Sequence, residues 1–139
     1  RDEKVGWASA WSERHIAHAC GLGTFGLCDG LITPKGKAVR IGSVVTNLKL
    51  TPTDRKYRHP KENCLFFRDE KGGKCMRRCP AGAITEKGHD KDKCREYLES
   101  EPMKAKRSEY GPKELSSACG LCQTGVPCEF RIPRPDLIA

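Results

Sequence analysis

Residues 75–84 read CMRRCPAGAI, and within them two cysteines stand three residues apart, the second followed directly by proline. Five further cysteines flank this stretch at uneven spacing: Cys64 before it, and Cys94, Cys119, Cys122 and Cys128 after it. Two more, Cys20 and Cys28, lie in a separate N-terminal region. Nine is an odd number, so a fully paired disulfide framework cannot account for every cysteine.

The composition favours metal ligation over a conventional hydrophobic core. The chain has 139 residues, of which 37% are hydrophobic and only 6% aromatic, which is little material for a domain of this size. The first four residues are charged and no apolar run follows them, so no signal peptide is expected. No stretch approaches membrane-spanning length either. We therefore expect a cytoplasmic, reducing location, where cysteines bind metal rather than pair as disulfides.

The spacing of the cysteines predicts an iron–sulfur protein. A Cys-x3-Cys-Pro sequence ends the ligand run of bacterial ferredoxins, and its last cysteine ligates the other cluster when two are present. By this crossover Cys79 joins the later cysteines, which predicts one complete 4Fe-4S site on the first cysteine set: Cys79, Cys94, Cys119 and Cys122. The remaining three cysteines form the second cysteine set: Cys64, Cys75 and Cys128. The second set is one thiolate short of a cubane.

The sequence leaves the second site open in three ways. A fourth ligand could come from elsewhere, the candidates being Cys20, Cys28, His59 and Asp69. The site could instead hold a 3Fe-4S cluster on three thiolates, or hold nothing. Zinc is the alternative metal, because it also takes four thiolates. Zinc ribbons usually use two Cys-x2-Cys knuckles, however, and this chain has one such pair.

The chain is basic, with 26 lysines and arginines against 18 acidic residues and a formal net charge of +8. No groove-reading motif accompanies this charge, so nucleic-acid binding is not favoured. We expect the basic side chains to offset the negative charge of thiolate clusters and to steer an acidic redox partner. The alternative is a zinc-bound or cluster-bound structural module without redox activity, which binds a partner or nucleic acid through its basic face.

A coarse reading of periodicity and turn residues gives five expected elements. Three helices are predicted, at Trp7–Cys20, Asp90–Ser100 and Pro112–Ala118. A strand is predicted over Val39–Leu50, where β-branched residues are enriched, and a turn is predicted at Thr33–Gly36.

Three glycines, Gly21, Gly23 and Gly26, match the Gly-x-Gly-x-x-Gly pattern of dinucleotide sites. That pattern should follow a strand and open a helix, whereas here it follows a predicted helix. A tight turn close to a cofactor or at a domain junction is therefore favoured over nicotinamide or flavin binding.

Several motifs in this order resemble one family. They are residues 14–26 (RHIAHACGLGTFG), residues 31–34 (LITP), residues 42–46 (GSVVT), residues 79–84 (CPAGAI), Cys94 ahead of Tyr97 and Leu98, and residues 119–123 (CGLCQ). Together they resemble the C-terminal part of epoxyqueuosine reductases and reductive dehalogenase-like proteins, and the similarity extends over nearly the whole chain.

The resemblance implies an oxidoreductase in which two 4Fe-4S clusters feed electrons to a cobalamin held by a nitroreductase-like domain. It implies an α+β fold: a small, irregular, cluster-stabilised ferredoxin-like domain at 60–130, preceded at 1–50 by a helix, glycine-rich loop and strand left from the cofactor domain. Residues 131–139 would form an extended tail. The three glycines would lie near the cofactor, and cobalamin would bind only with an N-terminal half beyond this chain. The partner would be a redox protein or that attached cofactor domain, and no catalytic residue is assigned.

One departure from the family pattern concerns the second cysteine set. The family's first run is Cys-x2-Cys-x2-Cys-x3-Cys-Pro, and here Asp69 and Gly72 stand where its first two cysteines would align. Cys64 lies earlier and is expected to replace one of them. The other has no obvious substitute, which is why the fourth ligand stays open.

Overall fold

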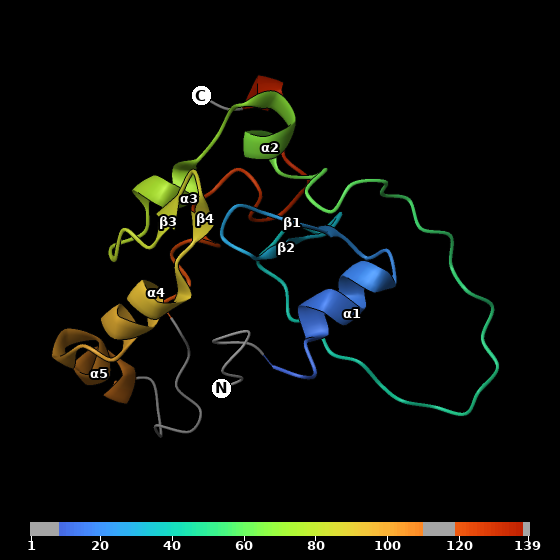
Figure 1. Cartoon of the computed structure of the whole chain (residues 1–139), viewed down its shortest axis with the longest axis horizontal. Helices are drawn as coiled ribbons and strands as arrows, with labels where there is room; N and C mark the ends of the chain where they lie inside the picture. Colours follow the sequence, from blue (N-terminus) through green and yellow to red (C-terminus); the bar gives the residue numbers. More distant parts are fainter. Residues whose placement is uncertain (1–8, 110–118, 138–139) are drawn as a thin grey trace.

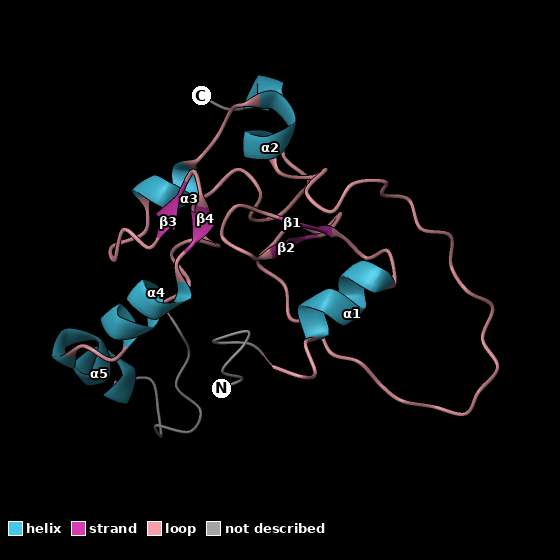
Figure 2. Cartoon of the chain, viewed as in Figure 1, coloured by secondary structure: helices cyan, strands magenta, loops and turns pink. Residues whose placement is uncertain are grey.

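The computed structural model describes residues 9–109 and 119–137. Within these ranges the chain has an α+β architecture with five α-helices and two two-stranded antiparallel sheets (Figure 2). In chain order the elements are α1 (Glu13–Ala19), β1 (Thr24–Phe25), β2 (Leu31–Ile32), α2 (Leu65–Asp69), α3 (Lys74–Arg77), β3 (Ile84–Thr85), β4 (Gly88–His89), α4 (Lys91–Leu98), α5 (Glu101–Ser108) and the 3-10 helix η2 (Pro135–Leu137). The α+β class is as predicted, whereas the finer ferredoxin-like and nitroreductase-like assignments stay predictions.

The short elements fall into two groups joined by loops (Figure 1). Helix α1 and the β1–β2 hairpin lie on one side, and α3, β3, β4, α4 and α5 lie on the other. The C-terminal loop, residues 119–134, contacts both groups. The backbone N–H of Lys37 donates to the Cys128 carbonyl at 2.8 Å, and Arg78 Nε, directly after α3, donates to the Leu121 carbonyl at 3.1 Å. The C-terminal loop thus holds the two groups together.

Helix α1 begins at Glu13, so the predicted helical start was too early. The Ser12 carbonyl accepts hydrogen bonds from the N–H groups of His15 and Ile16, both at 3.0 Å, which makes Ser12 the first residue of the helical ladder. Trp11 precedes it and is exposed, and Trp7 lies outside the described residues. The helix ends ahead of Gly21, whose φ of 75° is the left-handed conformation that glycine adopts readily.

The predicted strand at Val39–Leu50 was wrong. Residues 39–57 have no regular secondary structure and form the long loop at the edge of the molecule (Figure 2). Val44 and Val45 are 88% and 82% exposed, and no strand of the described chain pairs with this segment. A β-branched run becomes a strand only where a neighbouring strand satisfies its backbone groups. By contrast, the predicted turn at Thr33–Gly36 is confirmed by reciprocal backbone hydrogen bonds between these two residues.

Helix α4 confirms the prediction at Asp90–Ser100, with an end two residues earlier. The Asp90 side chain caps it by accepting a hydrogen bond from the Lys93 N–H at 2.9 Å. The Asp90 N–H donates to the Ala83 carbonyl at 2.8 Å, which fixes the start of α4 to the β3–β4 hairpin. Helix α5 follows at once and was not predicted. The helix predicted at Pro112–Ala118 lies outside the described residues.

Thiols make up a large part of the hydrophobic core. One connected cluster of buried side chains lies at its centre: Leu27, Cys28, Ile32, Cys64, Cys75, Ile84 and Val126. Three more cysteines pack against this cluster: Cys79, Cys122 and Cys128. The apolar shortage seen in the composition is therefore met by cysteine side chains, which behave as small hydrophobic groups when they are buried and unligated.

A buried polar contact joins the β1–β2 hairpin to the second half of the chain. Thr24 is fully buried, and its hydroxyl accepts a hydrogen bond from the Asn63 N–H at 2.8 Å. The Asn63 side chain donates to the Ile32 carbonyl at 2.9 Å. Because Asn63 directly precedes Cys64, these bonds fix the position at which the second half enters the core.

Gly36 allows the hairpin end to contact the C-terminal loop. Its φ is 86°, and a Cβ placed on it would collide with the Glu129 carbonyl oxygen. The same close approach lets the N–H groups of Lys37 and Ala38 donate to the Glu129 carbonyl, both at 2.9 Å. Gly36 is therefore required by both backbone conformation and space.

We predict that Gly36→Ala destabilises the protein by about 3 kcal/mol, because it adds left-handed strain and a backbone collision. Urea denaturation compared with the unaltered protein measures this. Gly42→Ala is the matched control, since no atom lies within 4 Å of a Cβ at Gly42. Equal stability of the two variants would show that the hairpin end does not dock on the C-terminal loop.

Candidate metal centre

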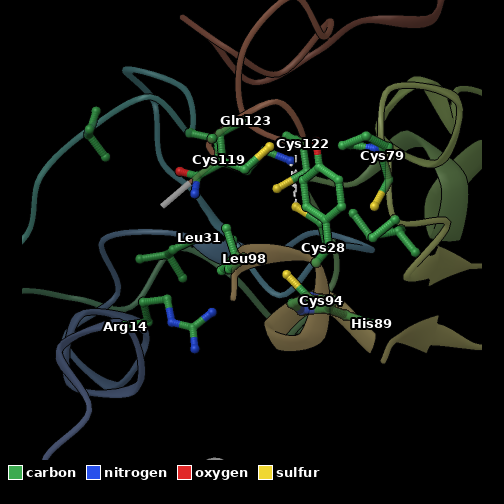
Figure 3. A pocket seen from close by; sticks show the side chains of 18 of the residues that line it. Arg14, Cys28, Leu31, Cys79, His89, Cys94, Leu98, Cys119, Cys122 and Gln123 are labelled. Carbon is green, nitrogen blue, oxygen red and sulfur yellow. Dashed lines mark hydrogen bonds between the residues drawn. The ribbon is translucent and has the colours of Figure 1, made fainter. Parts of the chain in front are cut away.

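The first cysteine set lines one cavity. All four of its members, together with Cys28, surround a space of about 230 Å³ (Figure 3). They come from separate segments: Cys79 follows α3, Cys94 lies within α4, and Cys119 and Cys122 belong to the C-terminal loop. The structure therefore brings together the four thiols that the crossover rule grouped.

Local hydrogen bonds hold the loops that carry these thiols. The Cys79 N–H donates to the Met76 carbonyl at 3.1 Å, and the Ala83 N–H donates to the Cys79 sulfur at 3.3 Å. The turn around Cys122 is closed by the Gln123 N–H, which donates to the Gly120 carbonyl at 2.8 Å. Backbone N–H groups directed at sulfur are one of the factors that set the potential of iron–sulfur clusters.

The electrostatics of Cys94 reflect how close the members of the first set lie to one another. Burial raises the pKa of the Cys94 thiol, and negative charge on Cys79 and Cys119 raises it further. Three thiols from three segments thus interact, and a cation among them would relieve this mutual repulsion.

The second cysteine set lines a second, smaller cavity. Cys64, Cys75 and Cys128 surround about 30 Å³ of space, walled also by Leu27 and Ile32. Burial raises the pKa of the Cys75 thiol to about 11, and charge on the other thiols adds to this effect. The three cysteines that the sequence left over as the second set therefore also lie together in space.

A buried lysine borders both cavities. The Lys37 side chain is 3% exposed, and its ammonium donates to the Cys28 sulfur at 3.0 Å. Burial acts to lower the pKa of Lys37, but negative charge on Cys28 and Cys128 outweighs burial, so the pKa is raised. A buried ammonium is stable only beside compensating negative charge, and the residues that supply it to Lys37 are cysteines.

Cys28 lines the first cavity and packs in one buried cluster with Cys64 and Cys75 of the second set. It is 4% exposed, and its sulfur lies 3.7 Å from the Cys122 carbonyl oxygen. Interaction with the Cys122 side chain, and then the Lys37 ammonium, lowers the pKa of the Cys28 thiol. Its charge also raises the pKa of Cys75 and of Cys128. Cys28 therefore interacts with one member of the first set and two of the second.

The first cavity is the larger of the two that cysteines line. Among the described residues, no three His, Cys, Asp or Glu side chains form a group that could hold one metal ion. A cubane instead binds each thiolate at a different iron, so its four ligands stand apart around a central volume. The four thiols of the first set come from separate segments of the chain and line one cavity. The second cavity has the right donors but room for little more than a water molecule, so its side chains must separate to admit a cluster.

The other candidates for the fourth ligand lie away from both cavities. Cys20 is exposed, and His59 is exposed with its Nδ1 accepting a hydrogen bond from the Lys61 N–H at 3.3 Å. Asp69 pairs with Arg68 at 2.8 Å. None of these three candidates lines either cavity.

Gly21 and Gly23 lie between α1 and β1, Gly26 directly follows β1, and none of the three lines the two cavities. Gly23 passes so close to β2 that a Cβ on it would lie 2.5 Å from the Ile32 carbonyl oxygen. Gly26 packs 3.3 Å from the Ile32 side chain by the same measure. Gly23 and Gly26 let the hairpin close on itself, and the role of the three glycines near a cofactor stays a prediction.

Comparison with known proteins gives no relative: no family model, no curated protein and no solved structure matches the chain. The family resemblance therefore stays a prediction from motifs. In the described part of the chain, no helix has the length and apolar character needed to cross a membrane.

Sequence reasoning missed Lys37 and left Cys28 as one candidate among four. A signal for Cys28 exists, because it lies in the apolar run around Leu27 and Leu31 and ahead of the turn at Thr33–Gly36. Nothing local distinguishes Lys37 from the exposed Lys35 two residues before it. Its burial results from contact with the C-terminal loop, almost a hundred residues away in sequence.

We predict that Asp90→Ala lowers stability by about 1 kcal/mol, because α4 loses its cap and holds Cys94 less firmly. Thermal unfolding of the metal-loaded protein measures this change. Asp90→Asn should restore most of the loss, since asparagine caps helices equally well. If the alanine and asparagine variants unfold at the same temperature, the cap contributes nothing.

Proposed function

We propose that the chain is an electron-transfer module that binds 4Fe-4S clusters on cysteine thiolates. The observation that carries this proposal is the spatial division of the cysteines. Spacing alone separated a set of four from a set of three, and the members of each set line one of two neighbouring cavities, with Cys28 as a fifth cysteine in the first. An arbitrary arrangement of reduced cysteines would not be expected to reproduce a grouping deduced from ferredoxin topology.

A bound 4Fe-4S cluster supplies reversible one-electron chemistry. The protein contributes the surroundings. The thiolates of the first set hold the irons. The Ala83 N–H points at the Cys79 sulfur and lowers the electron density of that sulfur. The Lys37 ammonium lines both cavities and offsets their negative charge. The buried apolar neighbours of the thiols, such as Ile84, exclude water from the sulfurs.

We further propose that this module belongs to an epoxyqueuosine-reductase-like oxidoreductase, in which the electrons pass to an attached or separate cofactor domain. This finer assignment rests on the motif resemblance. Cobalamin would be the acceptor only together with a cofactor-binding half beyond the present chain.

The first test is iron and sulfide per chain in anaerobically prepared protein. We predict about eight irons for two clusters, or about four if the first set alone is filled, with visible absorption that bleaches on reduction. Cys79→Ala should remove about four irons, since it removes one ligand of the first set.

Cys20→Ala is the matched control for this loss, because Cys20 is exposed and lines neither cavity. It should retain the full iron content. A colourless protein that binds zinc would overturn the electron-transfer proposal and favour the structural module.

We predict that Lys37→Met lowers the reduction potential of the bound clusters. The substitution keeps a long buried side chain but removes a positive charge that favours the reduced, more negative state. A redox titration followed by absorption measures the potential. Lys35→Met is the control, since Lys35 is exposed and should leave the potential almost unchanged. An unchanged or higher potential in Lys37→Met would refute this role.

A further inference from the structure

The second cysteine set needs a fourth donor, and the thiol of Cys28 lies in the same buried cluster as two of its members. Cys28 comes from the β1–β2 loop, far from the ferredoxin-type segment in sequence. In space it belongs to the same buried cluster as Cys64 and Cys75. No spacing rule points to it, because the contact arises only when the hairpin docks on the C-terminal loop.

Backbone hydrogen bonds fix this docking. Lys37 donates its N–H to the Cys128 carbonyl at 2.8 Å, and its ammonium reaches back to the Cys28 sulfur at 3.0 Å. One residue therefore connects Cys28 with a member of the second set through both its backbone and its side chain. A Cβ at Gly30 would lie 2.5 Å from the Lys37 side chain, so the lysine is held closely against the loop that carries Cys28.

Cys28 has neighbours in both sets: it lines the first cavity, and it packs in one buried cluster with Cys64 and Cys75, so the number of thiols in each set decides between them. Cys28 acts electrostatically on Cys75 and Cys128, both members of the second set. In the first set its contact is with Cys122, and Cys94 interacts with Cys79 and Cys119 instead. The first set already has four thiols of its own. The second has three.

We propose that Cys28 is the eighth cluster ligand and completes a second 4Fe-4S site with Cys64, Cys75 and Cys128. This inference rests on the proposed function. The second site then takes one thiolate from the N-terminal hairpin and three from the region of residues 64–128. Lys37 lines both cavities, so its ammonium offsets the negative charge of both sites.

Paired substitutions test which cluster Cys28 serves. Cys28→Ala should lower the iron content from about eight to about four per chain. Adding Cys64→Ala should cause no further loss, because both residues would serve one cluster. Adding Cys79→Ala instead should leave almost no iron. Cys20→Ala is the control and keeps about eight irons.

Several outcomes have a defined meaning. About seven irons with a three-iron EPR signal in Cys28→Ala also support the assignment, because they mark the loss of one ligand. Full iron content in Cys28→Ala overturns it. So does loss of all iron in the Cys28→Ala, Cys64→Ala protein, which would place Cys28 on the first cluster. Unaltered protein with about four irons overturns the second site and leaves the proposed function standing, whereas protein without iron overturns the proposed function itself.

One measurement does not depend on a variant that folds. In the unaltered, loaded protein the β-protons of ligand cysteines have hyperfine-shifted NMR signals. Selective isotope labelling of cysteine and sequential assignment should place one shifted pair at Cys28 and none at Cys20. A pair of ordinary, unshifted signals at Cys28 would rule out ligation.

Discussion

The pairing of a buried ammonium with buried sulfur is the interaction on which the centre of this molecule depends. Lys37 is almost fully buried, and the charges that stabilise it there belong to cysteines. An isolated ammonium in such a place would be costly, so Lys37 depends on the Cys28 sulfur to which it donates a hydrogen bond. The backbone N–H of the same lysine also binds the hairpin to the C-terminal loop. Lys37 therefore contributes both to charge balance in the core and to the docking of the hairpin.

The sequence predicted the grouping of the cysteines better than the architecture around them. Ligand spacing is a local property fixed by the geometry of a cluster, and it separates the first cysteine set from the second without any knowledge of tertiary contacts. Helix α4 was predictable for a similar reason, because its Asp90 cap is local. The strand prediction at Val39–Leu50 was wrong because a strand needs a neighbouring strand to pair with, and that pairing depends on tertiary contacts.

The places of Cys28 and Lys37 in the candidate site could not be predicted from local sequence patterns. Both lie in or next to the β1–β2 hairpin, and both become part of the candidate site only through contacts with residues near the C-terminus. Gly36 makes this approach possible by accepting a left-handed backbone against Glu129. A sequence pattern can identify such a glycine as a turn, but not the distant segment that packs on it.

The β1–β2 hairpin packs on a loop that lies almost a hundred residues later in the sequence, and this separation has a consequence for biosynthesis. The first cysteine set is complete only once Cys122 has been made, and the second cavity closes only with Cys128 and the Lys37 backbone bond to it. A chain still growing on the ribosome therefore lacks part of both sites until its C-terminal loop has emerged. Under the proposed function, iron and sulfide would be inserted only after the segment up to Cys128 has been made, and the factors that deliver them would meet free thiols rather than a half-built cluster.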